Sequence, residues 1–280
     1  MRELKYVAHD GTVIDLDTDS LWVPHLQDMR GSAWSTTLST RGLKTASRVA
    51  SATKMSVQST DPETLDRLMA LADFDVQAMT PGTLTVNGEW TQRAYLTGLT
   101  VSTVPMPGFA QADITVVLCD GVWRRRLETQ AFNPLHVDSG TSLDMPYDLP
   151  ADLASPKLIQ RVSNPGILPA EFTCRIFGQA TNPSFQLGGN VYRLNDLTVP
   201  AGAYLEIVAR SDEKSIVLHA ADGGLKDCFA NGERGSGRDG GTYLFQPIPA
   251  GETILSWSGA FDVEFDLFQT SGGVPWSTLS

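Results

Sequence analysis

The segment Thr242–Gly259 reads TYLFQPIPAGETILSWSG and carries two apolar runs on either side of a proline- and glycine-bearing corner. The runs Tyr243–Phe245 and Thr253–Trp257 are rich in the β-branched and aromatic residues that are typical of half-buried strands. In the corner, PIPAG, the two prolines fix φ and remove backbone donors, and Gly251 permits a positive φ. The segment predicts a β-hairpin with an apolar side and no polar cluster.

The rest of the second half also reads as short strands with turn residues between them, and no convincing helix interrupts them. This spacing predicts a β-sandwich or a jelly roll. The expected strands are residues 158–162, 170–177, 191–194, 204–209, 215–219 and 261–268.

The first half combines strands with one helix. Alternation from Leu4 to Ala8, a turn at Asp10-Gly11 and a second alternating run predict a hairpin, and Asn87-Gly88 marks another. Residues 62–72 have helical periodicity, with Asp61 able to cap the first turn. With a strand ending near residue 57, one opening at residue 82 and one at 112–118, we expect an antiparallel sheet with a helix on one side.

Two segments lack periodicity. Residues 24–47 are rich in Ser, Thr, Gly and Arg and predict a long loop or extended arm, of the kind that a partner often orders. Residues 131–156 contain Pro146 and Pro150 among polar residues, and Pro156 ends the segment. We therefore predict a mainly β protein with an N-terminal domain at 1–130, a linker at 131–156 and a C-terminal domain at 157–280.

Composition narrows the class of function. The chain has 280 residues, 41% hydrophobic and 19% charged, which is typical of a globular protein. A formal net charge of -11 disfavours binding to nucleic acid or to anionic membranes. No apolar run suits a membrane span or a secretory signal, so we expect synthesis and folding in the cytoplasm. The three cysteines are odd in number and widely spaced, which predicts buried free thiols.

Two motifs resemble ligand sites but lack required parts. Residues 235–240 match GxGxxG, but a strand rather than a helix is expected to follow, so we interpret them as a flexible loop. Asp15–Asp19 begin like a calcium loop, but Ser20 replaces the required glycine and Leu26 the bidentate glutamate. We interpret these carboxylates as solvent-facing.

Charged residues give three further candidates. Asp262, Glu264 and Asp266 share one face of a strand with about 6.6 Å between neighbours, which suits a glycosidase pair but is also explained by an amphipathic strand. Arg124–Arg126 suit a phosphate, a solvated strand end or an inter-subunit salt bridge, and the acidic background favours the last two. The histidines have no metal-ligand spacing; they are His9, His25, His136 and His219.

No catalytic, cofactor-binding or metal-binding residue is therefore predicted, and we expect no enzyme activity and no cofactor. The motifs do form an ordered series that resembles the distal tail protein (Dit) family of long-tailed, siphovirus-type phages. In the second half the resemblance rests on residues 164–170 (NPGILPA), 172–183 (FTCRIFGQATNP), 197–205 (LTVPAGAYL), the hairpin at 242–259 and Pro275-Trp276. In the first half it rests on the order of arm, strand, short helix, hairpin and closing strand.

This resemblance implies a structural hub at the distal end of a phage tail. It implies an N-terminal domain that assembles into a homo-hexameric ring and a galectin-like C-terminal β-sandwich. It also implies a tail tube protein on one side and a tail-associated tip or baseplate protein on the other. The acidic balance adds the hypothesis that DNA passes through an acidic ring lumen without adhering.

An alternative is a carbohydrate-binding adhesin module that recognises host cell-wall glycan. Trp257 or Trp276 would then stack on sugar rings. Both tryptophans also suit core packing, which is the more common place for tryptophan.

Overall fold

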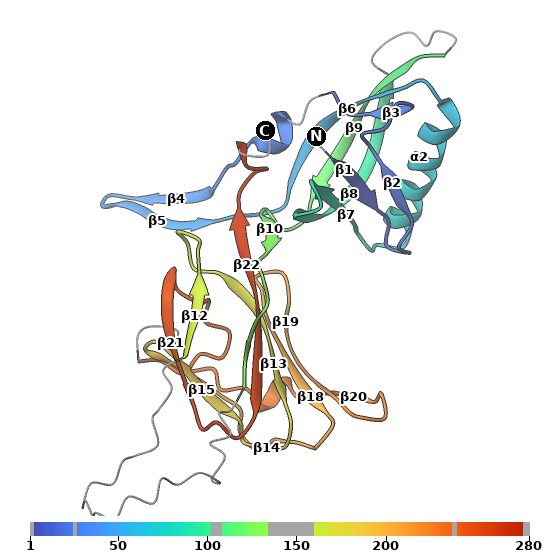
Figure 1. Cartoon of the computed structure of the whole chain (residues 1–280). Coiled ribbons are helices and arrows are strands. Elements are labelled where there is room, and N and C mark those ends of the chain that lie inside the picture. Colours follow the sequence, from blue (N-terminus) through green and yellow to red (C-terminus); the bar gives the residue numbers. More distant parts are fainter. Residues whose placement is uncertain (1–2, 25–26, 102–107, 134–159, 237–239, 277–280) are drawn as a thin grey trace, which may run out of the picture. The chain divides into compact units, whose positions relative to one another are not determined.

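The computed structural model describes residues 3–24, 27–101, 108–133, 160–236 and 240–276. It consists of two compact units, Met1–Arg126 with Thr270–Ser280, and Leu127–Gln269 (Figure 1). Residues 270–280 thus belong with the first unit, whereas the predicted C-terminal domain at 157–280 included them. The cause is local packing, because the buried Val274 joins the first core and its N–H donates to the Met29 carbonyl at 3.0 Å. The linker prolines lie outside the described residues.

The first unit is built on an antiparallel sheet with strand order β2-β1-β7-β8-β9-β6-β3, and β10 also pairs with β8. The strands are β1 (Leu4–Val7), β2 (Val13–Asp15), β3 (Leu21–Trp22), β6 (Ser51–Ser59), β7 (Gly82–Val86), β8 (Trp90–Val101), β9 (Ala110–Leu118) and β10 (Trp123–Arg126).

Both predicted hairpins of this unit are confirmed. β1 and β2 pair across a turn in which Gly11 has φ +87°. β7 and β8 pair across Asn87 and Gly88, which have φ +52° and +66°. Two consecutive positive φ angles are the signature of a type I′ turn, whose twist matches that of the flanking strands.

The predicted helix is confirmed and is longer than expected, since α2 spans Pro62–Gln77. Asp61 caps it by accepting a hydrogen bond from the Glu63 N–H at 3.1 Å. Leu68 and Ala72 are fully buried and belong to the core that the sheet forms. No helix among the described residues is long and apolar enough to cross a membrane.

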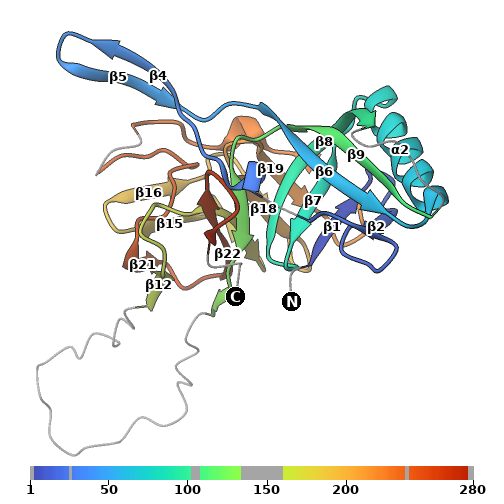
Figure 2. The ribbon, with the colours of Figure 1, turned by 90° about the horizontal axis from the view of Figure 1, so that it is seen from above.

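The predicted loop or arm at residues 24–47 contains a short helix, α1 (Gln27–Arg30), and a separate two-stranded sheet. β4 (Ser35–Ser39) and β5 (Gly42–Ser47) pair only with each other among the described strands, and every residue in both is exposed. Figure 2 shows them as a narrow ribbon that extends away from the sheet of their unit. We call residues 35–47 the arm.

The second unit consists of two antiparallel sheets. The larger has strand order β11-β22-β13-β18-β19-β20 and the smaller β12-β21-β15-β16. The larger sheet comprises β11 (Gln130–Phe132), β13 (Glu171–Phe177), β18 (Tyr204–Ala209), β19 (Lys214–His219), β20 (Leu225–Asp227) and β22 (Asp262–Ser271). The smaller comprises β12 (Gln160–Asn164), β15 (Ser184–Leu187), β16 (Asn190–Arg193) and β21 (Gly251–Trp257). A further pair, β14 (Ala180–Thr181) with β17 (Thr198–Val199), and a 3-10 turn, η1 (Phe229–Asn231), complete it.

One core joins the two sheets. Phe265 of the larger sheet meets Phe185 of the smaller at a ring-centroid distance of 5.5 Å, edge to face. Phe172 contacts Phe265 in the same way at 6.1 Å, and all three side chains are buried. Two sheets that share one apolar core form a β-sandwich, so the mainly β prediction is confirmed. A galectin-like outline stays a prediction.

The hairpin predicted at 242–259 is wrong in its first half. Only the second run forms a strand, β21, which pairs with β12 and β15 rather than with Tyr243–Phe245. The first run makes turn and bridge contacts instead: the Leu244 N–H donates to the Glu233 carbonyl, and Asn190 Nδ2 donates to the Tyr243 carbonyl. Leu244 and Phe245 are buried, so their apolar character reflects the core and not a strand. The positive φ of Gly251 is confirmed at +85°.

Candidate assembly surface

In the segment Asp15–Asp19, which resembles the start of a calcium loop, a carboxylate bonds to the segment's own backbone. Asp15 Oδ1 accepts a hydrogen bond from the Asp17 N–H at 2.9 Å, and Asp17 bridges to Trp22 across the turn. The described part of the chain contains no group of three His, Cys, Asp or Glu residues that could hold a metal ion. Leu26, His25 and His136 lie outside that part.

The GxGxxG segment forms a turn in its described part. The Thr242 N–H donates to the Ser236 carbonyl at 3.0 Å, while residues 237–239 lie outside the described residues. Residues 240–250 continue as turns and isolated bridges rather than as a helix. A helix N-terminus for a pyrophosphate is therefore missing at this point.

The three carboxylates of β22 do not share one exposed face, so the amphipathic-strand interpretation is wrong for Asp266. Asp262 is exposed, but Asp266 is only 2% exposed and accepts hydrogen bonds from Arg175 Nη1 at 3.0 Å and Thr129 Oγ1 at 2.6 Å. Burial acts to lower the pKa of Arg175, but the hydrogen bond to Glu206 and the charge of Asp266 raise it above its ordinary value. Arg175 of β13 thus joins Glu206 of β18 and Asp266 of β22 in an ion-pair network.

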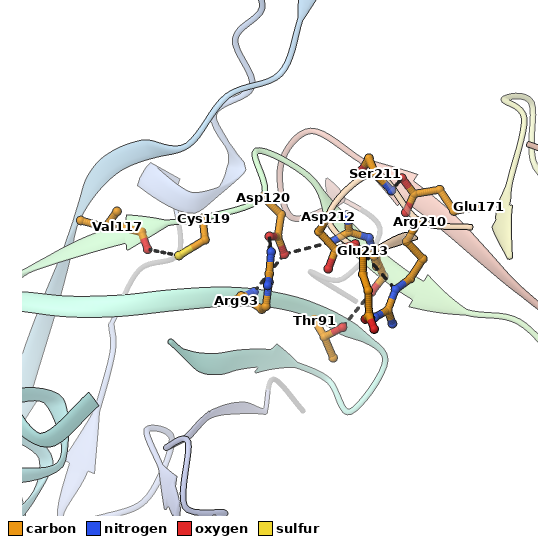
Figure 3. A network of polar contacts seen from close by, with 11 residues as sticks. Thr91, Arg93, Val117, Cys119, Asp120, Glu171, Arg210, Ser211, Asp212 and Glu213 are labelled. Carbon is orange, nitrogen blue, oxygen red and sulfur yellow. Dashed lines mark hydrogen bonds and ion pairs between the residues drawn. The ribbon is translucent and has the colours of Figure 1, made fainter. Parts of the chain in front are cut away.

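Arg124 is not at a solvated strand end, because it is only 6% exposed and its Nη1 bonds to Asp120 Oδ2 at 2.9 Å. Figure 3 shows Arg93 directed at the same carboxylate, with Nε and Nη2 at 2.9 and 2.6 Å from Oδ1. Arg125 pairs with Glu89 at 3.4 Å. Intrachain carboxylates therefore neutralise much of the predicted basic patch, which disfavours a phosphate site.

The cysteines are free, as predicted, with Cys174 and Cys228 buried and Cys119 partly buried. Burial raises the pKa of each thiol, most strongly that of Cys174. The raised pKa disfavours the reactive thiolate. His219 stacks on Tyr204 at 4.3 Å between ring centroids, which is a packing contact rather than a metal site.

The sequence did not reveal a buried polar cluster at the end of α2. Asp75 is fully buried and accepts a short hydrogen bond from the Tyr6 hydroxyl. It also accepts from the His9 N–H at 3.1 Å and contacts His9 Nδ1 at 2.6 Å. Burial, followed by the bond to Asp75, raises the pKa of Tyr6. Asp75 follows Leu68 and Ala72 at helical spacing on the buried face of α2. This spacing was the only signal in the sequence that could have predicted its burial.

The two tryptophans proposed for glycan stacking belong to different units and differ in exposure. Trp257 is half-buried against the sandwich core, and its Nε1 donates to the Phe261 carbonyl at 2.9 Å. Trp276 belongs to the first unit, where Arg30 lies over its ring at 5.2 Å. Core packing therefore explains Trp257 but not Trp276, which is 68% exposed.

A hollow of the first unit lies where the arm leaves the sheet. Its volume is about 460 Å³, and residues 31–35 and 49–53, which flank the arm, form much of its wall. We call it the arm-root groove. Its lining includes Trp34, Val49, Gln92, Leu118, Gly121 and Gly272.

The root of the arm is held firmly. Arg48 lies over the Trp34 ring at 4.3 Å, and its Nη1 donates to Ser32 Oγ at 2.7 Å. Gly272 approaches so closely that a Cβ there would lie 1.8 Å from Arg48 Nη1, and a Cβ at Gly121 would lie 2.7 Å from the Val49 carbonyl. At Gly121 the neighbouring atoms are backbone, so only glycine fits there, whereas at Gly272 the arginine side chain could move aside.

The arm also differs in charge from the rest of the chain. Residues 29–60 contain no Asp or Glu, whereas the chain as a whole has 32. The basic residues in this stretch are Arg30, Arg41, Lys44, Arg48 and Lys54. An exposed, basic arm with a hollow at its root is the feature of this chain best suited to binding another protein.

No family model and no curated protein matches the sequence. Several solved structures are similar to this chain in fold. The chain is similar to a chain of the phage p2 baseplate in its activated conformation with Ca, at a TM-score of 0.60 and 13% identity over 98% of this chain and 100% of that one. The corresponding structure with Sr gives a TM-score of 0.59 at 13% identity over the same shares.

The SPP1 Dit (gp 19.1) protein, described as a paradigm of the hub adsorption apparatus in phages that infect Gram-positive hosts, gives a TM-score of 0.60. The identity is 15%, over 96% of this chain and 99% of that one. The likeness covers both units, and the chain has a Dit-like fold. The resemblance seen in the sequence is thus confirmed at the level of fold.

Proposed function

We propose that this chain is a structural tail protein of a long-tailed phage, acting as the hub at the distal end of the tail. The observation that carries the proposal is the Dit-like fold over nearly the full length of the chain, in both units. In this role the chain joins the tail tube to the host-recognition tip or baseplate. It acts by assembly rather than by catalysis, and it needs no cofactor.

We infer that the N-terminal region, predicted as residues 1–130, forms a homo-hexameric ring, and that the sandwich projects outward. An exposed arm with a fixed root supports self-assembly of the first unit. The tail tube protein binds one side of the ring and a tail-associated tip or baseplate protein binds the other. The mature protein resides in the virion tail.

Negative-stain imaging of the purified full chain tests self-assembly. We expect six-fold rings with a central opening, and a persistent monomer at high concentration contradicts the ring. Mapping charge onto such a ring tests the acidic lumen, which a strongly basic inner wall would rule out.

Gold-labelled antibody against the chain, applied to purified virions, tests the location. We expect label at the tail end distal to the head. Label on the head, or virions that lack the protein, would contradict the hub function.

A further inference from the structure

We propose that the arm-root groove binds an extended, acidic segment of a different protein, which adds as a strand to the open edge of β6. The inference rests on the proposed function, in which the chain joins other tail proteins, and it names the surface and the chemistry of one such contact. Three independent observations carry it: an open strand edge, a buried acceptor without a donor, and a surrounding stretch that is basic and free of acids.

β6 is paired on one side only over most of its length. β9 pairs with it from Ser51 to Ser59, whereas β3 reaches it only at Gln58 and Ser59, and no other described strand pairs with it. Near its start, Ser51, Ala52 and Lys54 are exposed. An edge strand directs every second N–H and C=O group outward, and an extended peptide can add a strand to such groups.

The arm-root groove runs along this edge. Ser51 and Ala52 line it, and so do residues 31–34, which belong to no helix or strand. Because β4 and β5 pair as far as Ser35 with Ser47, residues 31–34 continue beside the chain that leads into β6. The volume of about 460 Å³ lies within the range of ligand sites, so the groove holds an extended segment of a few residues.

Gln92 lines the groove and lacks a donor. Its side chain is 2% exposed, and no described residue donates a hydrogen bond to its Oε1. It alternates on β8 with the buried Trp90 and Ala94, so a polar atom stands on the core side of this strand. A buried acceptor without a donor is costly. Each peptide unit other than that of proline carries an N–H, so an extended segment supplies the missing donor.

The surroundings of the groove favour a segment that is apolar and acidic. Trp34 and Val49 line the groove and are 54% and 55% exposed, so an apolar side chain of the segment would cover them. Residues 29–60 contain five basic residues and no acidic one, and the exposed Lys54 lies beside the open edge. Carboxylates in the segment are therefore attracted to this surface.

A second copy of this chain is a poor occupant. A strand of a second copy would bring the rest of its sheet with it, and residues 31–34 beside the start of β6 leave room for one added strand but not for a sheet. The arm forms a narrow sheet of its own, but it carries no acid and is basic like the groove's surroundings. The remaining occupant is a single segment of a different protein.

Binding of synthetic peptides to the purified full chain tests the docking. The probe is a dye-labelled peptide of sequence Glu-Val-Glu-Leu-Glu-Val with blocked ends, followed by fluorescence anisotropy. We expect saturable binding with a dissociation constant below about 1 mM, which weakens as salt screens the charges. A peptide with lysine in place of each glutamate should bind at least about tenfold more weakly. An acidic peptide that shows no saturable binding overturns the docking.

N-methylation separates strand addition from attraction by charge alone. Two control peptides have the same sequence and carry methyl groups on alternate backbone nitrogens, one in each register. Each methyl pattern removes the donors along one edge of the peptide and keeps its charge. We expect one of the two to bind at least about tenfold more weakly than the parent peptide. Equal affinity of all three peptides would indicate charge attraction alone and would overturn strand addition.

Variants of the chain locate the site. Gln92→Leu should raise the dissociation constant up to about tenfold through the lost hydrogen bond, while the free chain becomes more stable because an unsatisfied polar atom is removed. Lys54→Glu should raise the constant at least about threefold. Arg67→Glu is the matched control, an equal change of charge at an exposed position of α2, and should leave binding unchanged. Equal effects of the two charge changes, or unaltered binding by the Gln92 variant, would overturn the groove as the site.

Sedimentation velocity with and without the peptide identifies the occupant. We expect saturating peptide to leave self-association unchanged. Oligomers that dissociate when the peptide binds would show that a second copy fills the groove, and would overturn the proposal. Peptide binding by a protein that is missing from virions would overturn the proposed function and leave the docking standing. Label at the distal tail end, combined with no peptide binding, would overturn the docking and leave the proposed function standing.

Discussion

Two hairpins of the first unit, β7–β8 and the arm, have similar polar strands and short turns but differ in burial. β7–β8 has buried residues in alternation, including Leu84 and Val86, and packs into the core. The arm, β4–β5, has no buried residue. Both have polar strands and short turns, but only the first repeats a large apolar residue at every second position over several positions. A hairpin packs when one whole face is apolar, and projects when its apolar residues are confined to the tip.

This difference predicts where the unit is sensitive to mutation. Changes in the packed hairpin should lower the stability of the first unit, whereas changes in the arm should leave stability intact and affect association. Tryptophan fluorescence follows the first unit well, because all of the six tryptophans except Trp257 belong to it.

The largest effect is expected for Gly82→Val in β7. A Cβ at this position would lie 2.5 Å from the Tyr6 hydroxyl and 2.7 Å from Asp75 Oδ2, so the cluster must move. We expect the free energy of unfolding to fall by about 3 kcal/mol in urea denaturation. The comparison variant is Gly42→Val in the arm, where φ is +108° and a Cβ meets no atom within 4 Å. Its backbone strain is confined to the arm, which buries no residue, so the global free energy of unfolding should hardly change. Equal losses for both variants would refute the distinction.

Asp75→Ala removes the acceptor that joins the helix to β1. The Tyr6 hydroxyl and the His9 N–H would lose their buried partner, and we expect a loss of about 2–3 kcal/mol. Asp75→Asn keeps an acceptor and should lose less. Thermal unfolding of the three proteins gives the ranking, and an Asn variant that is less stable than the Ala variant would contradict it.

Gly251→Val tests backbone strain in the second unit, at the turn that leads into β21. Here φ is +85° with open space around the position, so the penalty comes from backbone strain alone. We expect a loss of between about 1 and 2 kcal/mol. Gly251→Asn, which tolerates a positive φ better, should lose less. Unchanged thermal stability of the valine variant would contradict the strained turn.

Replacement of residues 35–47 by a short Gly-Ser turn should have the smallest effect on stability, within about 0.5 kcal/mol. The same variant should weaken self-association in sedimentation velocity, because the exposed arm that supports the proposed self-assembly is gone. A large loss of stability would show that the arm is part of the fold and would remove the contrast between the two hairpins.

Much of the fold was predictable because its signals are local. Asn87-Gly88 fixes a turn through its own backbone preferences, and Asp61 caps α2 through its own side chain. The mainly β class followed from repeated alternation.

Other features depended on contacts between distant residues. The burial of Asp75 depends on Tyr6 and His9, and the burial of Asp266 on Arg175 and Thr129, none of which the strand or helix period reveals. The run Tyr243–Phe245 looked like a strand because apolar residues serve both strands and irregular core segments.

The sequence by itself thus determined the turns, the helix start, the strand-rich class and the resemblance to the Dit family. Only the tertiary structure decided which strands pair, which carboxylates are buried and that the segment at residues 24–47 contains an exposed hairpin with a groove at its root. The physical reason is the sequence separation of the interacting residues. Backbone conformation is set by neighbours in the chain, whereas burial and pairing are set by residues that folding brings together.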